Sequence, residues 1–108
     1  MADLDFDLTV GRDESGAYRL TLRGELDLGT AERLEQALAD AEGEVLLDLR
    51  GLTFMDSTGV RVLLEVAEQR NSELRMIVPA QGEVRLTIEE TGIAPLLPLV
   101  DAETGERQ

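Results

Sequence analysis

The chain has 108 residues and a formal net charge of −13, from 10 basic side chains against 23 carboxylates. It contains no His and no Cys, which excludes Ser-His-Asp triads, histidine phosphorelay, disulfides and thiolate metal sites. Every basic residue is Arg, so a Walker phosphate loop and Schiff-base chemistry, which need Lys, are excluded as well. We therefore expect a protein that is not an enzyme and that uses no metal ion or cofactor.

The length suits a single domain over residues 1–108, with a core from about 5 to 100 and a flexible acidic tail over 101–108. The strong negative charge repels nucleic acid and favours a basic or mixed-charge protein partner. No apolar run approaches the ~18 residues that a membrane helix needs. The acidic start, Met1 to Asp5, is unlike a signal peptide, so we expect a cytoplasmic protein that contacts no membrane.

The N-terminal part of the chain predicts an antiparallel hairpin. Apolar and polar residues alternate from Asp5 to Val10 and again from Tyr18 to Arg23, which is the period of a half-buried strand. A polar turn over residues 11–16 separates the two strands. Residues 24–29 are then expected to carry the chain out of the sheet.

Two amphipathic helices and an interior strand follow. Thr30 stands where a helix cap belongs, and apolar residues recur at helical spacing as far as Ala41. Residues 45–49 form a short apolar run typical of an interior strand, and residues 50–55 are expected to link it to the second helix. That helix begins at the Asp56-Ser57-Thr58-Gly59 turn and is broken at residues 70–72.

The C-terminal part predicts a strand over residues 74–78 and a helix from about Glu83 to Thr91, ended by Gly92. A final strand is expected over residues 96–100, at a sheet edge because Pro98 cannot donate to a ladder. Strands that alternate with helices imply parallel pairing. We therefore predict an α/β fold: a mixed sheet with an N-terminal antiparallel hairpin and helices packed mainly on one face.

Asp56-Ser57-Thr58-Gly59 is the segment that carries the most chemistry. It follows a buried strand and opens a helix, and functional groups collect at the carboxyl ends of strands in open α/β sheets. A Ser at a helix N-terminus is exposed, and a phosphate on its oxygen would meet free backbone N–H groups. Capping is the simpler interpretation, since Asp, Ser and Thr are all standard caps. A helix needs only one cap, however, and three possible caps stand here in a row.

The segment from Asp48 to Leu64, which reads Asp-Leu-Arg-Gly-Leu-Thr-Phe-Met-Asp-Ser-Thr-Gly-Val-Arg-Val-Leu-Leu, resembles the signature of the STAS domain of sulphate transporters and anti-sigma factor antagonists. Gly24-Glu25-Leu26-Asp27 resembles the second landmark of that family, placed before the first helix. The resemblance runs from about Asp5 to Val100. Within the family, the chain is most similar to the free-standing bacterial anti-sigma factor antagonists.

This resemblance implies partner switching rather than catalysis. The unphosphorylated protein would bind an anti-sigma factor that is also an ATP-dependent serine kinase, and binding would free the sigma factor for transcription. The kinase would phosphorylate the Ser that directly follows Asp, here Ser57, and a serine phosphatase would reset the switch. The expected partner-binding residues are Asp27, Asp56, Ser57, Thr58, Gly59 and Arg61.

Several of these residues have a structural alternative. Asp27 lines the partner surface by family analogy, or it accepts hydrogen bonds from N–H groups of its own turn. Asp48 is interpreted as a structural carboxylate, and Arg61 as a solvated helix residue next to the site. Phe54 and Met55 either contact a partner or hold the helix against the core.

Two other functions stay open. A STAS scaffold or sensor subunit of a larger signalling assembly would never be phosphorylated at Ser57. A magnesium-dependent phosphoryl-transfer site would use Asp27, Asp48 and Asp56, although the Lys that a receiver-type site needs is missing. The sequence does not fix the oligomeric state, and we expect a monomer or a weak dimer.

Overall fold

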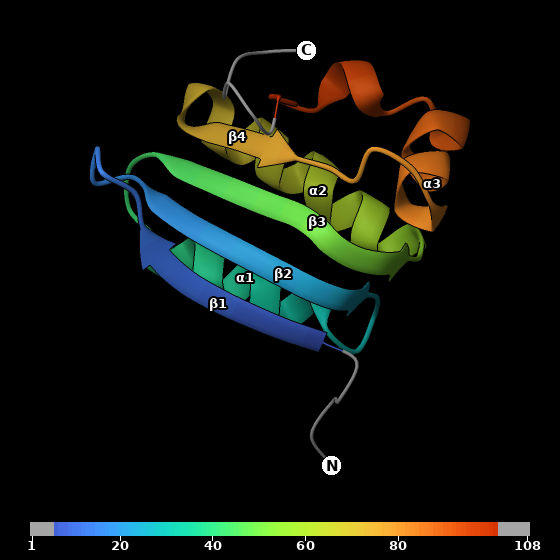
Figure 1. The fold of residues 1–108 in the computed structure, drawn as a ribbon, viewed down its shortest axis with the longest axis horizontal. Helices are drawn as coiled ribbons and strands as arrows, with labels where there is room; N and C mark the ends of the chain where they lie inside the picture. The colour runs from blue at the N-terminus through green and yellow to red at the C-terminus, as the bar shows by residue number, and fades with distance from the viewer. Residues whose placement is uncertain (1–5, 102–108) are drawn as a thin grey trace.

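The computed structural model describes residues 6–101, which form one four-stranded sheet with helices (Figure 1). The sheet has the order β1-β2-β3-β4, with β1 antiparallel to β2 and the other pairs parallel. The strands are β1 (Phe6–Arg12), β2 (Tyr18–Leu26), β3 (Val45–Met55) and β4 (Leu74–Ile77). The helices are α1 (Ala31–Asp40), α2 (Ser57–Arg70) and α3 (Glu83–Thr91), with short 3-10 helices η1 (Asn71–Glu73) and η2 (Ala94–Leu96).

The helices gather on one face because β2, β3 and β4 follow one another across the sheet in chain order. Right-handed crossovers that step in one direction place their helices on the same side. In Figure 1, α1 and α2 lie behind the sheet, and α3 follows the carboxyl end of β4. This confirms the predicted mixed sheet with an N-terminal antiparallel hairpin. Side chains of all three helices share one core with the strands, among them Leu20, Leu22, Leu47, Leu49, Leu34, Leu38, Val62, Leu63, Val84 and Ile88.

The face of the sheet that the helices leave open carries a smaller apolar cluster. It consists of Leu46 from β3, Ile77 from β4 and Val100 from the C-terminal segment. The same face carries an ion pair between Arg19, the register partner of Leu46, and Asp48. The alternation of side chains along β2 and β3 therefore places the main core on the helix-covered face and the charged side chains on the open face, as expected for a sheet that is covered on one side.

Three strands are longer than the sequence predicted, and β1 exceeds its predicted end by two residues, to Arg12. β2 continues through the Gly-Glu-Leu segment to Leu26. β3 continues through residues 50–55, which were predicted from the sequence to be a link between the strand and α2. Register shifts in the pairing of β2 with β3, between Thr21 and Arg23 and again between Gly24 and Glu25, interrupt the alternation of side chains there. Strict period-two alternation breaks at such irregularities, so the strands predicted from it end earlier than β2 and β3 do.

The expected final strand over residues 96–100 is reduced to one bridge. Leu99 pairs in parallel with Met76 of β4. The Met76 N–H donates to the Pro98 carbonyl oxygen, and Val100 N–H donates to the Met76 carbonyl oxygen, each at 2.9 Å. Pro98 has no N–H to extend the ladder, and η2 takes up Leu96. The segment thus lies along the β4 edge, as predicted, without forming a strand.

The third helix has the predicted bounds, and Gly92 ends it with a left-handed φ of 72°. Ile93 directly after it is buried in the core, which matches the apolar contact expected of such a helix end. Within residues 6–101, no helix combines the length and the apolar composition that crossing a lipid bilayer requires.

Candidate functional site

The site expected from the sequence lies where β2 and β3 end side by side. Leu26 and Met55, the last residues of the two strands, are register partners. The backbone N–H of Asp56 donates to the carbonyl oxygen of Leu26 at 3.2 Å. The loop that begins at Asp27 and the helix that begins at Ser57 therefore leave the sheet at neighbouring points.

Gly59 brings the first turn of α2 against this strand end. Gly59 is buried, and a Cβ atom added to it would lie 2.6 Å from the Leu26 carbonyl oxygen and would also overlap the Met55 side chain. The backbone that approaches Gly59 is thus that of β2 in the same chain. A side chain here would push α2 away from the sheet, so glycine sets the position of the helix N-terminus.

Asp56 is the residue that caps α2. Its backbone is extended, and its Oδ1 accepts a hydrogen bond from the Gly59 N–H at 3.0 Å. This is the geometry of an N-cap bonded to the third helical residue. The sequence offered three possible caps in a row, and the structure uses the first for this bond. Ser57 and Thr58 follow as the first two residues of the helix.

The other predicted residues of α2 differ in their exposure. Ser57 is exposed, whereas Thr58 is half-buried. Arg61 is also exposed, and its Nη1 forms an ion pair with Glu65 Oε1 at 2.9 Å, one turn further along the helix. An exposed ion pair of this kind contributes little to stability. Arg61 could therefore contact a partner protein while losing only its weak interaction with Glu65.

A hydrogen-bonded turn fixes the loop after β2. Thr30 is buried, and its hydroxyl accepts from the Asp27 N–H at 2.9 Å and donates to the Glu25 carbonyl oxygen at 2.8 Å. The Asp27 Oδ1 accepts from the Gly29 N–H at 3.0 Å. The turn role of Asp27 is therefore present in the structure, and the same turn holds its half-buried carboxylate near the start of α2.

Thr30 does not cap α1 through its side chain, contrary to the sequence expectation. It occupies the N-cap position, but its backbone is already helical and its hydroxyl makes no bond to the helix. The hydroxyl is turned back toward β2 instead, where it satisfies the polar backbone of the turn. A buried Thr with two backbone partners locks the loop, which is a role that spacing alone does not reveal.

Two exposed apolar side chains stand beside these polar groups. Leu28, in the loop after Asp27, is 79% exposed, and Phe54, two residues before Asp56, is 41% exposed. Met55, directly after Phe54, is buried in the core. Of Phe54 and Met55, whose role the sequence left open, only Met55 stabilises the fold from inside. Leu28 was not among the residues predicted from the sequence, although an apolar residue between Asp27 and Gly29 was a signal for it.

Asp48 lies away from this edge, within β3 on the open face of the sheet. Its carboxylate accepts hydrogen bonds from the Arg50 side chain and backbone and from Arg19 Nη2 at 2.7 Å. Burial alone would raise the pKa of Asp48, but the bonds from Arg50 and Arg19 outweigh it and lower this pKa to about 2. Asp48 is a structural carboxylate, as interpreted from the sequence.

The carboxylates of the alternative phosphoryl-transfer site are not brought together. Asp27 and Asp56 flank the ends of β2 and β3, whereas Asp48 is engaged by two guanidinium groups seven residues before the end of β3. In residues 6–101, no three acidic, His or Cys side chains come close enough to hold a metal ion. The geometry thus offers no cluster of the kind that this alternative requires.

Comparison with known proteins places the fold. The family model described as Mlab, STAS domain matches residues 10–99. The anti-sigma-F factor antagonist RsfB of Mycobacterium tuberculosis is 33% identical over 104 residues, which cover 88% of this chain and 85% of RsfB. An anti-sigma factor antagonist from Mycobacterium paratuberculosis has a similar structure, with a TM-score of 0.75 and 27% identity over 92% of this chain and 89% of that one. SpoIIAA, an anti-sigma factor antagonist solved in its unphosphorylated form, shares the fold with a TM-score of 0.67 and 21% identity over 90% of each chain.

These matches agree with the two segments that carried the sequence resemblance. The Gly24 to Asp27 segment and the Asp56 to Gly59 turn lie at the ends of adjacent strands and form one edge. The family match also extends over nearly all of the described residues. The chain therefore belongs to the STAS-domain family, among the anti-sigma factor antagonists.

Proposed function

We propose that this protein, in its unphosphorylated form, binds an anti-sigma factor that is also a serine kinase, and so releases a sigma factor. Phosphorylation of Ser57 ends the binding, and a serine phosphatase restores it. The observation that carries the proposal is the position of Ser57. Its exposed hydroxyl opens α2 directly beside the Asp27 turn, at the edge where two family landmarks meet.

The surroundings of Ser57 suit a protein partner. Leu28, in the loop after β2, and Phe54, near the end of β3, expose apolar area, and such side chains supply binding energy when a partner excludes water from them. Asp27 and Asp56 add negative charge to the same edge, on a chain whose formal charge is −13. A partner with a basic rim around an apolar centre would match this surface. We expect this cycle of binding and phosphorylation to take place in the cytoplasm, where both transcription and ATP are found.

A phosphate on Ser57 would oppose that binding without unfolding the protein. The modification adds a charge of about −1.5 to −2 at neutral pH. The N-terminal N–H groups of α2 favour a nearby anion, so the helix tolerates the group. In the complex, however, the phosphate would have to be buried next to Asp56. Burying an unpaired charge costs several kcal/mol, and about 1.4 kcal/mol is a tenfold loss of affinity.

The first experiment measures binding to candidate anti-sigma factors by calorimetry. We expect Ser57→Ala to bind like the unmodified protein and Ser57→Asp to bind at least a hundredfold more weakly. Ser72→Asp is the matched control, because Ser72 is exposed and follows the opposite end of α2. Equal affinity of Ser57→Asp and the unmodified protein contradicts the proposal.

The second experiment separates the antagonist from a scaffold or sensor subunit. The protein is incubated with the anti-sigma factor and ATP, and the product is analysed by mass spectrometry. We expect one phosphate, located on Ser57 and absent from Ser57→Ala, and its removal by a serine phosphatase should restore binding. A scaffold subunit would bind its partner and gain no phosphate at any time.

A further inference from the structure

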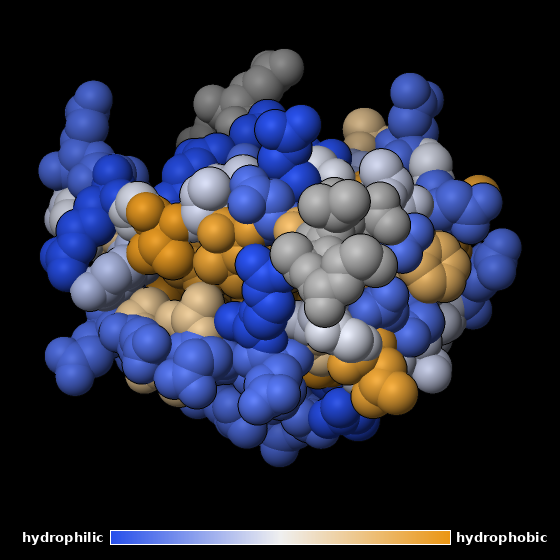
Figure 2. Space-filling model, turned by 90° about the horizontal axis from the view of Figure 1, so that it is seen from below, coloured by the Kyte–Doolittle hydropathy of each residue, from blue (hydrophilic) through white to orange (hydrophobic). Residues whose placement is uncertain are grey.

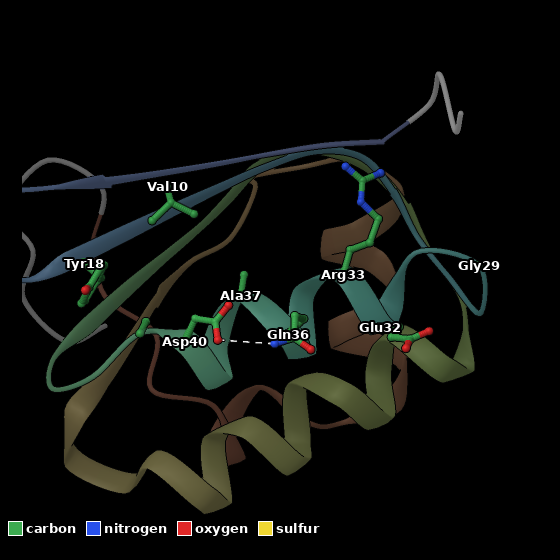
Figure 3. A pocket seen from close by; sticks show the side chains of 9 residues that line it. Val10, Tyr18, Gly29, Glu32, Arg33, Gln36, Ala37 and Asp40 are labelled. Carbon is green, nitrogen blue, oxygen red and sulfur yellow. Dashed lines mark hydrogen bonds between the residues drawn. The ribbon is translucent and has the colours of Figure 1, made fainter. Parts of the chain in front are cut away.

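A groove separates β1 from α1 on the side of the molecule away from β4. It has a volume of about 570 Å³ and is lined on the sheet side by Val10 and Tyr18 and on the helix side by Ala37 and Ala41. Figure 2, which views the β1 edge, shows apolar side chains gathered in the hollow between sheet and helices. In Figure 3 the side chains of Val10 and Ala37 point toward each other across it.

The groove adjoins an edge strand. β1 pairs only with β2, so the backbone groups on its other side face outward within the described part of the chain. β1 contains no Pro and no bulge in its seven-residue pairing with β2, and these are two of the devices that protect an edge from further pairing. Its charged residues are Asp7 and Arg12. Val10 is 56% exposed, although its side chain lies on the helix-covered face.

We propose that this edge pairs with a second copy of the chain, β1 against β1 in antiparallel orientation, to form a weak two-fold dimer. The occupant is inferred from the sequence of β1 itself. With Leu8 on the two-fold axis, Leu8 faces Leu8 of the other copy, and Val10 faces Phe6. The three apolar side chains on the groove face, Phe6, Leu8 and Val10, then each oppose an apolar side chain, which favours a cross-strand pair.

The β1 side chains on the open face of the sheet are also compatible with the Leu8-centred register. Asp7 opposes Thr9 of the other copy, so no carboxylate faces a carboxylate. A register centred on Thr9 is less favourable, since it would set Arg12 against Phe6, where the Arg33 guanidinium already lies 4.8 Å from the ring centroid. Like charges would then meet at each end of the interface. Charge thus selects the Leu8-centred register, and a two-fold axis makes both halves of the contact equal.

Net charge limits the strength of this dimer. Each copy carries a formal charge of −13, and Glu32 and Asp40 stand on the α1 side of the groove. The two copies therefore repel one another at long range, and salt screens this repulsion. We expect a dimer that forms at high protein concentration and strengthens with ionic strength. β1 is an outer strand of the sheet, whereas Ser57 follows the carboxyl end of β3. The dimer therefore does not depend on the proposed function.

The first test is sedimentation velocity of the intact protein at rising concentration, with and without about 1 M sodium chloride, where the Debye length is about 3 Å. We expect a monomer–dimer equilibrium that shifts toward the dimer with salt. Val10→Arg should weaken it at least tenfold, since the new guanidinium meets Phe6 and Arg33 of the other copy. Leu86→Arg on α3 is the control, because Leu86 is similarly exposed at 50%. A monomer at about 1 mM protein, or a dimer that Val10→Arg leaves unchanged, overturns the proposal.

The second test uses the absence of Cys from the chain. Opposed Cβ atoms lie about 4.5–5.5 Å apart in an antiparallel pair, near the separation of a disulfide. Leu8→Cys should therefore link two copies under mild oxidation. Val10→Cys is the matched control on the same face, because two copies of residue 10 would lie four residues apart along the strand, about 13 Å. Equal linking of both variants, or of neither, contradicts this pairing.

Discussion

The backbone N–H of Asp56 and the carbonyl oxygen of Leu26, 3.2 Å apart, join the end of β3 to the end of β2. The same carbonyl oxygen lies where a side chain on Gly59 would have to pass. The Leu26 carbonyl group thus accepts a hydrogen bond from Asp56, the residue before α2, and packs against Gly59 in the first turn of α2. The polar residues of the Asp27 turn and of the Ser57 helix start are held in one arrangement by this contact.

Replacing Gly59 should damage this arrangement. In Gly59→Ala the new methyl group meets the Leu26 carbonyl oxygen and the Met55 side chain, and relief requires α2 to shift. We expect a loss of about 1–3 kcal/mol in unfolding free energy, measured by urea denaturation. Gly29→Ala is the control, since its Cβ atom would lie 3.5 Å from the nearest atom, Asp27 Oδ1. Equal stability losses in the two variants contradict this account.

The cap of α2 can be tested through its carboxylate. Asp56→Ala removes the acceptor for the Gly59 N–H and should lower the unfolding free energy by about 1 kcal/mol. Asp56→Asn keeps an oxygen at the same position and should recover most of that loss. Comparable values for Asp56→Asn and Asp56→Ala would show that Asp56 acts through its charge rather than through the cap.

The Thr30 hydroxyl is expected to control the order of the Asp27 turn. Thr30→Val preserves shape but leaves the Asp27 N–H and the Glu25 carbonyl oxygen without this partner, which costs about 1–3 kcal/mol for a buried group. Hydrogen exchange at Asp27 and Gly29 should become faster. Thr30→Ser, which retains the hydroxyl, should show slower exchange than Thr30→Val, and no difference between them rules out this role.

Leu28 and Phe54 should affect partner binding and leave folding unchanged. Leu28→Ala and Phe54→Ala remove exposed apolar area near the paired ends of β2 and β3, so each should weaken binding to the anti-sigma factor about tenfold with little change in urea midpoint. Leu96→Ala is the control, because Leu96 is 66% exposed and belongs to η2. An equal effect of Leu96→Ala would mean that the loss is not specific to the Ser57 edge.

Stability should fall in acid because of Asp48. Its pKa is about 2 in the folded protein against an ordinary value of 3.8, so the folded state binds this proton less readily than the unfolded chain does. The resulting stabilisation, about 2 kcal/mol, is complete above pH 3.8 and is lost as the pH falls toward 2. Unfolding free energies measured across this window should fall less steeply in Asp48→Asn. Parallel curves for the two proteins would contradict the assignment.

Local sequence determined the order and type of most elements. The alternation in the N-terminal hairpin, the bounds of α3 and the turn at Asp56 were readable because they depend on residues close together in the chain. The family resemblance added Ser57, which the turn by itself did not separate from its neighbours. Both rest on information that the linear sequence carries directly.

Only the tertiary structure decided which residues of the site act together. The hydroxyl of Thr30 turns back to the Glu25 carbonyl oxygen of β2 rather than to α1. Gly59 packs against Leu26 because the ends of β2 and β3 pair at Leu26 and Met55, far apart in the chain. The spacing of residues along the chain does not reveal the packing of Gly59, since this packing depends on the register of β2 with β3. The sequence by itself determined a helix start with Ser57 directly after Asp56, and the packing of β2 against β3 and α2 determined the edge on which Ser57 lies.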